Sequence, residues 1–129
     1  MTEAIVLITA ESGYDASIVN QLEAFPETKH AFGTLGKYDV IARFASTDEK
    51  KLEHILKDVR NIDHIIGVLT LHMRGKESLL GKKLSSEENE ILDKFAVQAY
   101  VTIRTKNRTN DETLKNLGKI PEVIEGDLV

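Results

Sequence analysis

The chain has 129 residues, of which 41% are hydrophobic and 29% charged, and its formal net charge is −4. This length suits one compact domain, or one small domain with an appendage, and the acidic balance disfavours a protein whose main task is to coat nucleic acid phosphates. The absence of cysteine excludes disulfides, thiolate zinc sites and cysteine nucleophiles. No apolar run is long enough to cross a bilayer and no basic, apolar leader opens the sequence, so we expect a cytoplasmic protein with no membrane partner.

The first part of the chain predicts a strand and then a helix. Residues Ala4–Ala10 form a short continuous apolar run, which is typical of a strand buried on part of both faces. After a break at 11–14, Asp15 is positioned to cap a helix by accepting from the free amides of its first turn. Pro26 ends this helix, because proline disfavours helical geometry in the residue before it. The apolar stripe of the helix comprises Ile18, Val19, Leu22 and Phe25.

The centre of the chain predicts a hairpin of two strands, Lys29–Leu35 and Tyr38–Ala45. Gly36 lies between them and can adopt a positive φ without steric cost, so the chain can reverse within a few residues. The alternation of the second strand places one set of residues on an inward face and another on the opposite face. The inward set is Val40, Ala42 and Phe44, and the opposite set is Asp39, Ile41 and Arg43.

Tyr38 and Asp39 lie at the mouth of this hairpin. A carboxylate beside an aromatic ring can receive an ammonium group, the carboxylate by charge and the ring by its face. Aspartate at a turn also commonly accepts hydrogen bonds from turn amides, which is a purely structural role. From the residues alone, both interpretations of Asp39 stay open.

A second helix and a fourth strand complete the first unit. Ser46 and Glu49 have the spacing of a capping box, and His64–Met73 reads as the closing strand. The order strand, helix, strand, strand, helix, strand predicts an α+β domain, with an antiparallel four-stranded sheet and both helices on one face. The other face is left uncovered, so an apolar surface there predicts dimerisation. The stripe of the second helix is Leu52, Ile55, Leu56, Val59 and Ile62, and the uncovered face includes Ile41, Leu69 and Leu71.

The rest of the chain predicts a linker and a partial repeat. Residues 1–75 form the first domain, 76–95 a linker with a short helix that starts at the capping-box pair Ser85 and Glu88, and 96–129 the repeat. Residue n of 4–34 corresponds to residue n + 95 without a gap, which predicts a strand, helix, strand half-repeat. Its strand edges need a partner, either the first domain's sheet or a neighbouring chain. The identical pairs include Ala4 and Ala99, Val6 and Val101, Ile8 and Ile103, Leu22 and Leu117, and Pro26 and Pro121.

The segment Ala31–Asp39, with its aromatic strand followed by Gly36, Lys37, Tyr38 and Asp39, resembles the effector-binding domain of the Lrp/AsnC regulators, also called the RAM domain. The resemblance covers residues 4–73, and 99–129 look like the first half of the same domain. It implies a ferredoxin-like βαββαβ sandwich of the dimeric α/β-barrel type, which dimerises through its sheets and binds amino acids or similar effectors between subunits.

The resemblance also implies roles for individual residues. Gly36 would shape the loop, Asp39 would take the amino group of an effector, and Thr70 matches the second threonine of the closing strand. The predicted effector-binding residues are Gly36, Tyr38, Asp39, Thr70 and His72. His64 departs from the pattern, because it replaces the usual glycine. No helix-turn-helix precedes the first strand, so the chain resembles a stand-alone module that senses a metabolite or joins mixed assemblies with full-length regulators.

The sequence predicts no catalytic residue, no metal and no cofactor. His64 and His72 are eight residues apart on one strand, too far to hold one ion. Two other functions stay open: a cofactor-independent, monooxygenase-like enzyme of the same fold, with an apolar pocket in each monomer, and a purely structural oligomerisation module. We predict a non-enzymatic sensor that works as a homodimer or higher homo-oligomer, binds no nucleic acid directly, and modulates transcription through partner regulators.

Overall fold

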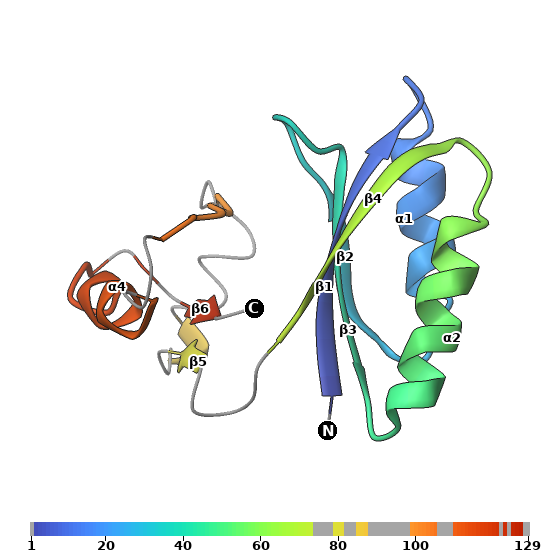
Figure 1. Cartoon of the computed structure of the whole chain (residues 1–129). Helices are drawn as coiled ribbons and strands as arrows, with labels where there is room; N and C mark the ends of the chain where they lie inside the picture. Colours follow the sequence, from blue (N-terminus) through green and yellow to red (C-terminus); the bar gives the residue numbers. More distant parts are fainter. Residues whose placement is uncertain are drawn as a thin grey trace. The chain divides into compact units, whose positions relative to one another are not determined.

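The computed structural model describes residues 2–73, 79–81, 85–87, 99–105, 110–121, 123 and 125–127. The chain divides into two compact units, the first ending at Met73 and the second spanning Arg74–Leu128 (Figure 1). Among the described residues, no helix combines the length and the apolar character needed to cross a membrane.

The N-terminal unit has the predicted order of elements. They are β1 (Thr2–Ala10), α1 (Asp15–Glu23), β2 (Thr28–Gly33), β3 (Val40–Ser46), α2 (Glu49–Arg60) and β4 (Ile65–His72). The strands form one antiparallel sheet in the order β2-β3-β1-β4, and both helices cover the same face of it (Figure 1). The predicted ferredoxin-like sandwich is therefore confirmed.

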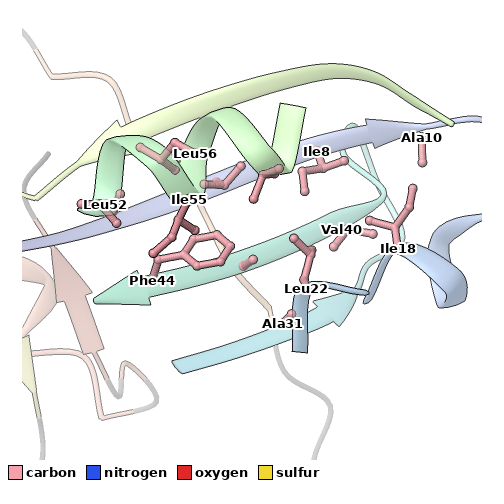
Figure 2. Packing of buried hydrophobic residues seen from close by; sticks show 14 residues of the cluster. Ile8, Ala10, Ile18, Leu22, Ala31, Val40, Phe44, Leu52, Ile55 and Leu56 are labelled. Atoms are coloured by element: carbon pink, nitrogen blue, oxygen red, sulfur yellow. The ribbon is translucent and has the colours of Figure 1, made fainter. Parts of the chain in front are cut away.

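The core lies between the sheet and the two helices (Figure 2). Phe44 on β3 is fully buried there, as are Ile18 and Leu22 of α1. The inward set predicted for β3 is correct, since Val40 and Ala42 are also fully buried. The predicted stripe of α2 is confirmed too, and its buried residues are Leu52, Ile55, Leu56 and Val59.

Both helix caps predicted for the first domain are wrong. The position before α1 is Tyr14, with no side-chain cap, and Asp15 is instead the first helical residue. Asp48 precedes α2, and its carboxylate accepts from the Lys50 amide at 2.9 Å. Ser46 belongs to β3, and its hydroxyl accepts from the Asp48 amide at 3.2 Å. The chain turns two residues later than the capping-box spacing predicts, because the strand continues through Ser46.

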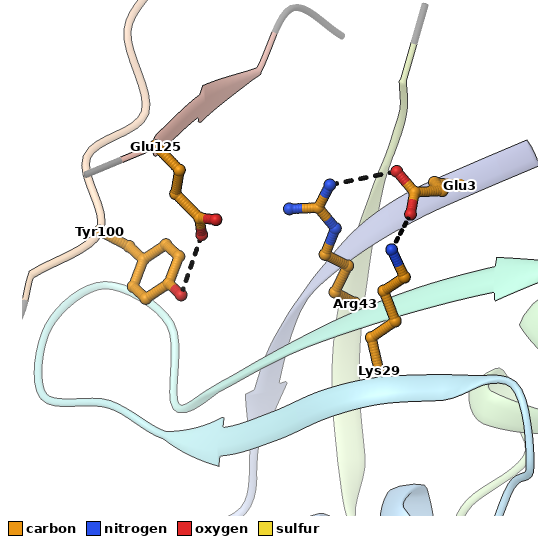
Figure 3. A network of polar contacts seen from close by, with 5 residues as sticks. All are labelled: Glu3, Lys29, Arg43, Tyr100 and Glu125. Atoms are coloured by element: carbon orange, nitrogen blue, oxygen red, sulfur yellow. Dashed lines mark hydrogen bonds and ion pairs between the residues drawn. The ribbon is translucent and has the colours of Figure 1, made fainter. Parts of the chain in front are cut away.

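The sheet face opposite the helices carries apolar residues and one ion-pair network. The strand registers place Ile5, Leu7, Ile41, Leu69 and Leu71 on this face. Glu3 there binds Arg43 at 3.1 Å through one oxygen and Lys29 through the other (Figure 3). The side chains of Glu3 and Arg43 are only 14% and 11% exposed, so solvent screens their attraction weakly.

We expect this network to make the stability of the N-terminal unit fall in acid. Burial raises the pKa of Glu3, but hydrogen bonds from Lys29 and Arg43 and their charges outweigh it, so the pKa lies below its ordinary value of 4.5. The stabilisation is therefore complete above the unfolded-state pKa and is lost as the pH falls through the lowered folded-state pKa. Urea unfolding should show that Glu3→Gln costs about 1 to 2 kcal/mol at neutral pH and clearly less in strong acid. An equal loss at both pH values would contradict this account.

The C-terminal unit contains β5 (Leu79–Gly81), which pairs antiparallel with β6 (Glu125–Asp127), and α4 (Asn110–Leu117). The helix and last strand of the predicted half-repeat are thus present. Its first strand is not, because residues 99–105 belong to no strand. A strand depends on backbone hydrogen bonds to a neighbouring strand. The strands β5 and β6 are too short to hold residues 99–105 in a strand conformation. Of the predicted helix at 85–95, the structure describes 85–87, where Ser86 and Glu87 are helical, and the remainder lies outside the described residues.

Candidate functional site

The hairpin between β2 and β3 is closed by its own hydrogen bonds. The Thr34 amide donates to the Asp39 carbonyl at 2.9 Å, and the Thr34 hydroxyl donates to the Tyr38 carbonyl at 2.7 Å. Between them, Gly36 has φ +148°, a value that side-chain-bearing residues rarely adopt. The sequence prediction that Gly36 makes this reversal possible is confirmed.

Asp39 ties this hairpin to β1. Its amide donates to the Ile8 carbonyl at 2.8 Å, and its carboxylate oxygen Oδ2 accepts from the Ala10 amide at 2.7 Å. Part of the structural interpretation is therefore observed, although the amide bound is on β1 rather than in the turn. Among the described residues, no hydrogen bond reaches the other oxygen, Oδ1. Asp39 is only partly buried, so this second oxygen can accept from a further group.

The ring of Tyr38 already contacts a side-chain cation of the same chain. The Lys37 ammonium lies 5.9 Å from the centre of the Tyr38 ring, within the range of a cation–π contact. An effector ammonium that used this face would have to displace Lys37. Since Lys37 is exposed and its side chain is long, that displacement costs little.

A second polar group lies at the same end of the sheet, where β1 ends and β4 begins. The His64 ring stacks on Tyr14 with centroids 3.5 Å apart, and its Nδ1 lies 3.1 Å from Glu11 Oε2. His64 also has φ 73°, a backbone conformation that glycine adopts without steric cost and that other residues rarely adopt. The contacts of His64 with Tyr14 and Glu11 were not predicted from the sequence. Among the described residues, no three acidic or histidine side chains gather closely enough to hold a metal ion.

Thr70 and His72 lie on β4, away from the hairpin. In the sheet Thr70 pairs with Val6 and His72 with Ala4, whereas the hairpin bonds β1 at Ile8 and Ala10. Four residues of strand separate Ala4 from Ile8, which is about 13 Å. Within one subunit, the structure therefore brings Gly36, Tyr38 and Asp39 together and keeps His72 apart from them. Thr70 is nearer, about 7 Å along β1 from Ile8, but it lies on the helix-covered side with Val6. The Thr70 hydroxyl is buried and has no hydrogen-bond partner among the described residues.

His72 lines a small cavity near the start of β1. The cavity has a volume of about 150 Å³, and its other lining residues are Thr2, Glu49, Leu52 and Glu53. All of these residues except Leu52 are polar. The apolar pocket that the enzyme interpretation requires is therefore not what this cavity provides.

We expect Gly36→Ala to destabilise the hairpin by about 1 to 2 kcal/mol, because alanine pays a steric cost at positive φ. Gly67→Ala is the matched control, since an added Cβ meets no atom within 4 Å at either position and only Gly36 has a positive φ. Urea unfolding should show a loss for the first variant and no loss for the second. Equal effects on both would mean that the conformation of Gly36 is not what the hairpin requires.

The comparisons with known proteins agree with this fold. The family model described as the Lrp/AsnC ligand binding domain matches residues 3–73. The hypothetical protein PHS023 from Pyrococcus horikoshii is 26% identical with TM-score 0.55, and the match covers 59% of this chain and 93% of that one. The protein FFRP-DM1 is 27% identical with TM-score 0.54, and the match covers 57% of this chain and 100% of that one.

Escherichia coli AsnC has the same fold, with 21% identity and TM-score 0.57 over 64% of this chain and 56% of that one. No curated protein matches the sequence. PHS023 and FFRP-DM1, which are covered almost completely, correspond to little more than half of this chain.

Proposed function

Because the chain belongs to the Lrp/AsnC family of ligand-binding domains through residues 3–73, we propose that it is a non-enzymatic sensor of a small metabolite that carries an ammonium group, an amino acid or a close relative. The sensor works in the cytoplasm as a homodimer or higher homo-oligomer. It changes transcription through partner regulators of the same family and does not itself contact nucleic acid.

The observation that carries this proposal is the arrangement of Asp39. One oxygen is fixed by the Ala10 amide, which holds the carboxylate in place, and the other remains available to a ligand. A carboxylate that is already oriented loses little entropy when it binds, and a charge-assisted hydrogen bond to an ammonium is among the stronger ones. The Tyr38 ring beside it already attracts one ammonium, that of Lys37.

The positions of Thr70 and His72 support a site formed by two subunits. An amino acid is too short to touch both Asp39 and His72 within one subunit, given the separation of about 13 Å along β1. The hairpin of one subunit laid beside β4 of another would bring the two sets together. Thr70 pairs with the buried Val6, so its hydroxyl lies on the helix-covered side of β4; it has no hydrogen-bond partner among the described residues, and a ligand that enters past the edge of β4 could satisfy it.

The uncovered sheet face supports the oligomeric part of the proposal. Leu69 remains 45% exposed on this face, among other apolar side chains of β1, β3 and β4. Burying such a face against a second copy removes apolar surface from water, which stabilises the dimer by about 25 cal/mol for each Å² buried. An isologous dimer is the simplest way to cover it.

The bond between Asp39 and Ala10 favours a second candidate, a purely structural oligomerisation module. In that case Asp39 only connects the hairpin to β1, and no small molecule binds. Calorimetric titration of the chain with each of the twenty amino acids separates the two functions. The sensor predicts saturable heat with at least one of them, and the structural module predicts heat with none.

A further inference from the structure

The C-terminal unit reproduces the local structure of the N-terminal unit. The helix α4 begins at Asn110, the position that corresponds to Asp15 at the start of α1 when 95 is added to the residue number. The connection after each helix is closed by the same three backbone hydrogen bonds. They run from Ala24 to Gln21, Phe25 to Leu22 and Thr28 to Phe25, and again from Lys119 to Asn116, Ile120 to Leu117 and Val123 to Ile120.

In this second copy, β5 takes the position that β3 has in the first. Gly126 corresponds to Ala31, and it pairs with Leu80 as Ala31 pairs with Ala42. Glu125 corresponds to His30, so its partner Gly81 occupies the position of Arg43. The β5–β6 pair is thus a counterpart of the β3–β2 pair, although β5 itself lies outside the repeat.

The same register predicts where residues 99–105 belong. In the N-terminal unit Arg43 lies between His30 and Ile5, and the counterparts of these two are Glu125 and Tyr100. The Tyr100 hydroxyl donates to Glu125 Oε1 at 3.5 Å (Figure 3). Because Gly81 on β5 has no side chain, a tyrosine on one side of β5 can reach across it to β6 on the other side. This contact therefore fits residues 99–105 as the strand beside β5, the counterpart of β1.

A strand in the position of β1 needs a second neighbour on its other edge. In the N-terminal unit that neighbour is β4, and the described part of the C-terminal unit has no counterpart of β4. Meanwhile Val101 and Ile103 are 76% and 50% exposed, although their counterparts Val6 and Ile8 are fully buried. Exposed β-branched residues on an open strand edge favour pairing with another strand.

We propose that Ala99–Thr105, which belongs to no strand in the single chain, becomes the edge strand of the C-terminal unit by pairing antiparallel with the same segment of a second copy of the chain, around a twofold axis at Thr102. The segment is complementary to itself in that register. Val101 lies opposite Ile103, Tyr100 opposite Arg104 and Thr102 opposite Thr102, which are β-branched, cation–π and threonine pairs. The two residues of each pair lie on the same face of the sheet, as strand pleating requires. The pairing joins two short sheets into one, and it uses no residue of the proposed effector site.

Disulfide cross-linking tests this pairing cleanly, because the chain has no cysteine of its own. In Thr102→Cys the two introduced thiols lie directly opposite each other, within the Cα separation that a disulfide spans. Under mild oxidation we expect most of this variant to become covalent dimer. The matched control is Thr105→Cys, an exposed residue of the same segment whose two copies lie roughly 20 Å apart in this register. We expect it to give little dimer.

Two further variants make the register itself testable. The double variant Ala99→Cys with Thr105→Cys should regain the cross-link that Thr105→Cys lacks. Adding Val101→Asp to Thr102→Cys should lower the dimer yield severalfold, because a carboxylate then faces Ile103 of the second copy. The proposal is overturned if Thr102→Cys yields no more dimer than Thr105→Cys, or if Val101→Asp leaves the yield unchanged. Amino acid binding by Thr102→Cys, measured in parallel, reports on the proposed sensor independently.

Discussion

Replacing Asp39 by asparagine should weaken effector binding by about 1.5 to 3 kcal/mol, roughly tenfold to 150-fold, and leave the fold intact. Asparagine keeps an oxygen that can accept from the Ala10 amide, so the tie between hairpin and β1 survives. It lacks the negative charge that an ammonium would need. Calorimetry with the best-binding amino acid measures the first effect, and urea unfolding measures the second.

Asp39→Ala is the companion variant, because it removes the charge and the tie together. The Ala10 amide then loses its partner in a partly buried position, which should lower the free energy of unfolding by about 1 to 3 kcal/mol. If asparagine binds the amino acid as tightly as the wild type while alanine destabilises the chain, the carboxylate has only the structural role.

Phe44→Ala should lower the free energy of unfolding of the N-terminal unit by about 3 to 5 kcal/mol. Phe44 is fully buried between the sheet and both helices, and among the described residues it is the largest of the completely enclosed side chains (Figure 2). Truncation removes its transfer free energy and leaves a cavity that the rigid sheet cannot close. Denaturant unfolding followed by circular dichroism provides the measurement.

Phe32→Ala is the matched control, because it truncates the same residue type on the adjacent strand β2. Phe32 pairs with Ile41 on the opposite face of the sheet and is only partly buried. Its loss should therefore be clearly smaller. Comparable losses for the two variants would mean that the helix-covered face is not the main core of the unit.

The fold of the N-terminal unit was predictable because apolar periodicity indicates its helices and its central hairpin strand, and because a short continuous apolar run indicates its first strand. The stripe from Leu52 to Val59 and the alternation from Val40 to Phe44 each have one period and one buried face. The helix starts were not predictable in the same way. Ser46 and Asp48 both suit a cap, and only the length of β3 decides between them.

The candidate site was predictable only in part. Gly36 and Asp39 stand together in the sequence, so their shared hairpin could be inferred. The bond from Ala10 to Asp39 uses a main-chain amide, which no sequence pattern marks. The contact between Tyr14 and His64 joins residues of two separate loops, and it depends on the register of β4 beside β1.

The partial repeat shows the limit of sequence similarity. Residues 99–105 match β1 in apolar pattern, and the helix and last strand of the repeat are present, but no strand forms there. A strand depends on its neighbours more than on its own residues, and the described part of the C-terminal unit offers residues 99–105 only the short β5–β6 pair. The short β5 could not be predicted as a substitute for β3, because it comes from the region expected to be a linker.

A crystal structure of the assembled protein with its bound amino acid would test the central claim most directly. The sensor account predicts the ligand ammonium at about 3 Å from Asp39 Oδ1, with β4 of another subunit on the opposite side of the ligand. A ligand held elsewhere, such as in the cavity beside His72, or an Asp39 carboxylate that bonds only main-chain amides, would contradict it.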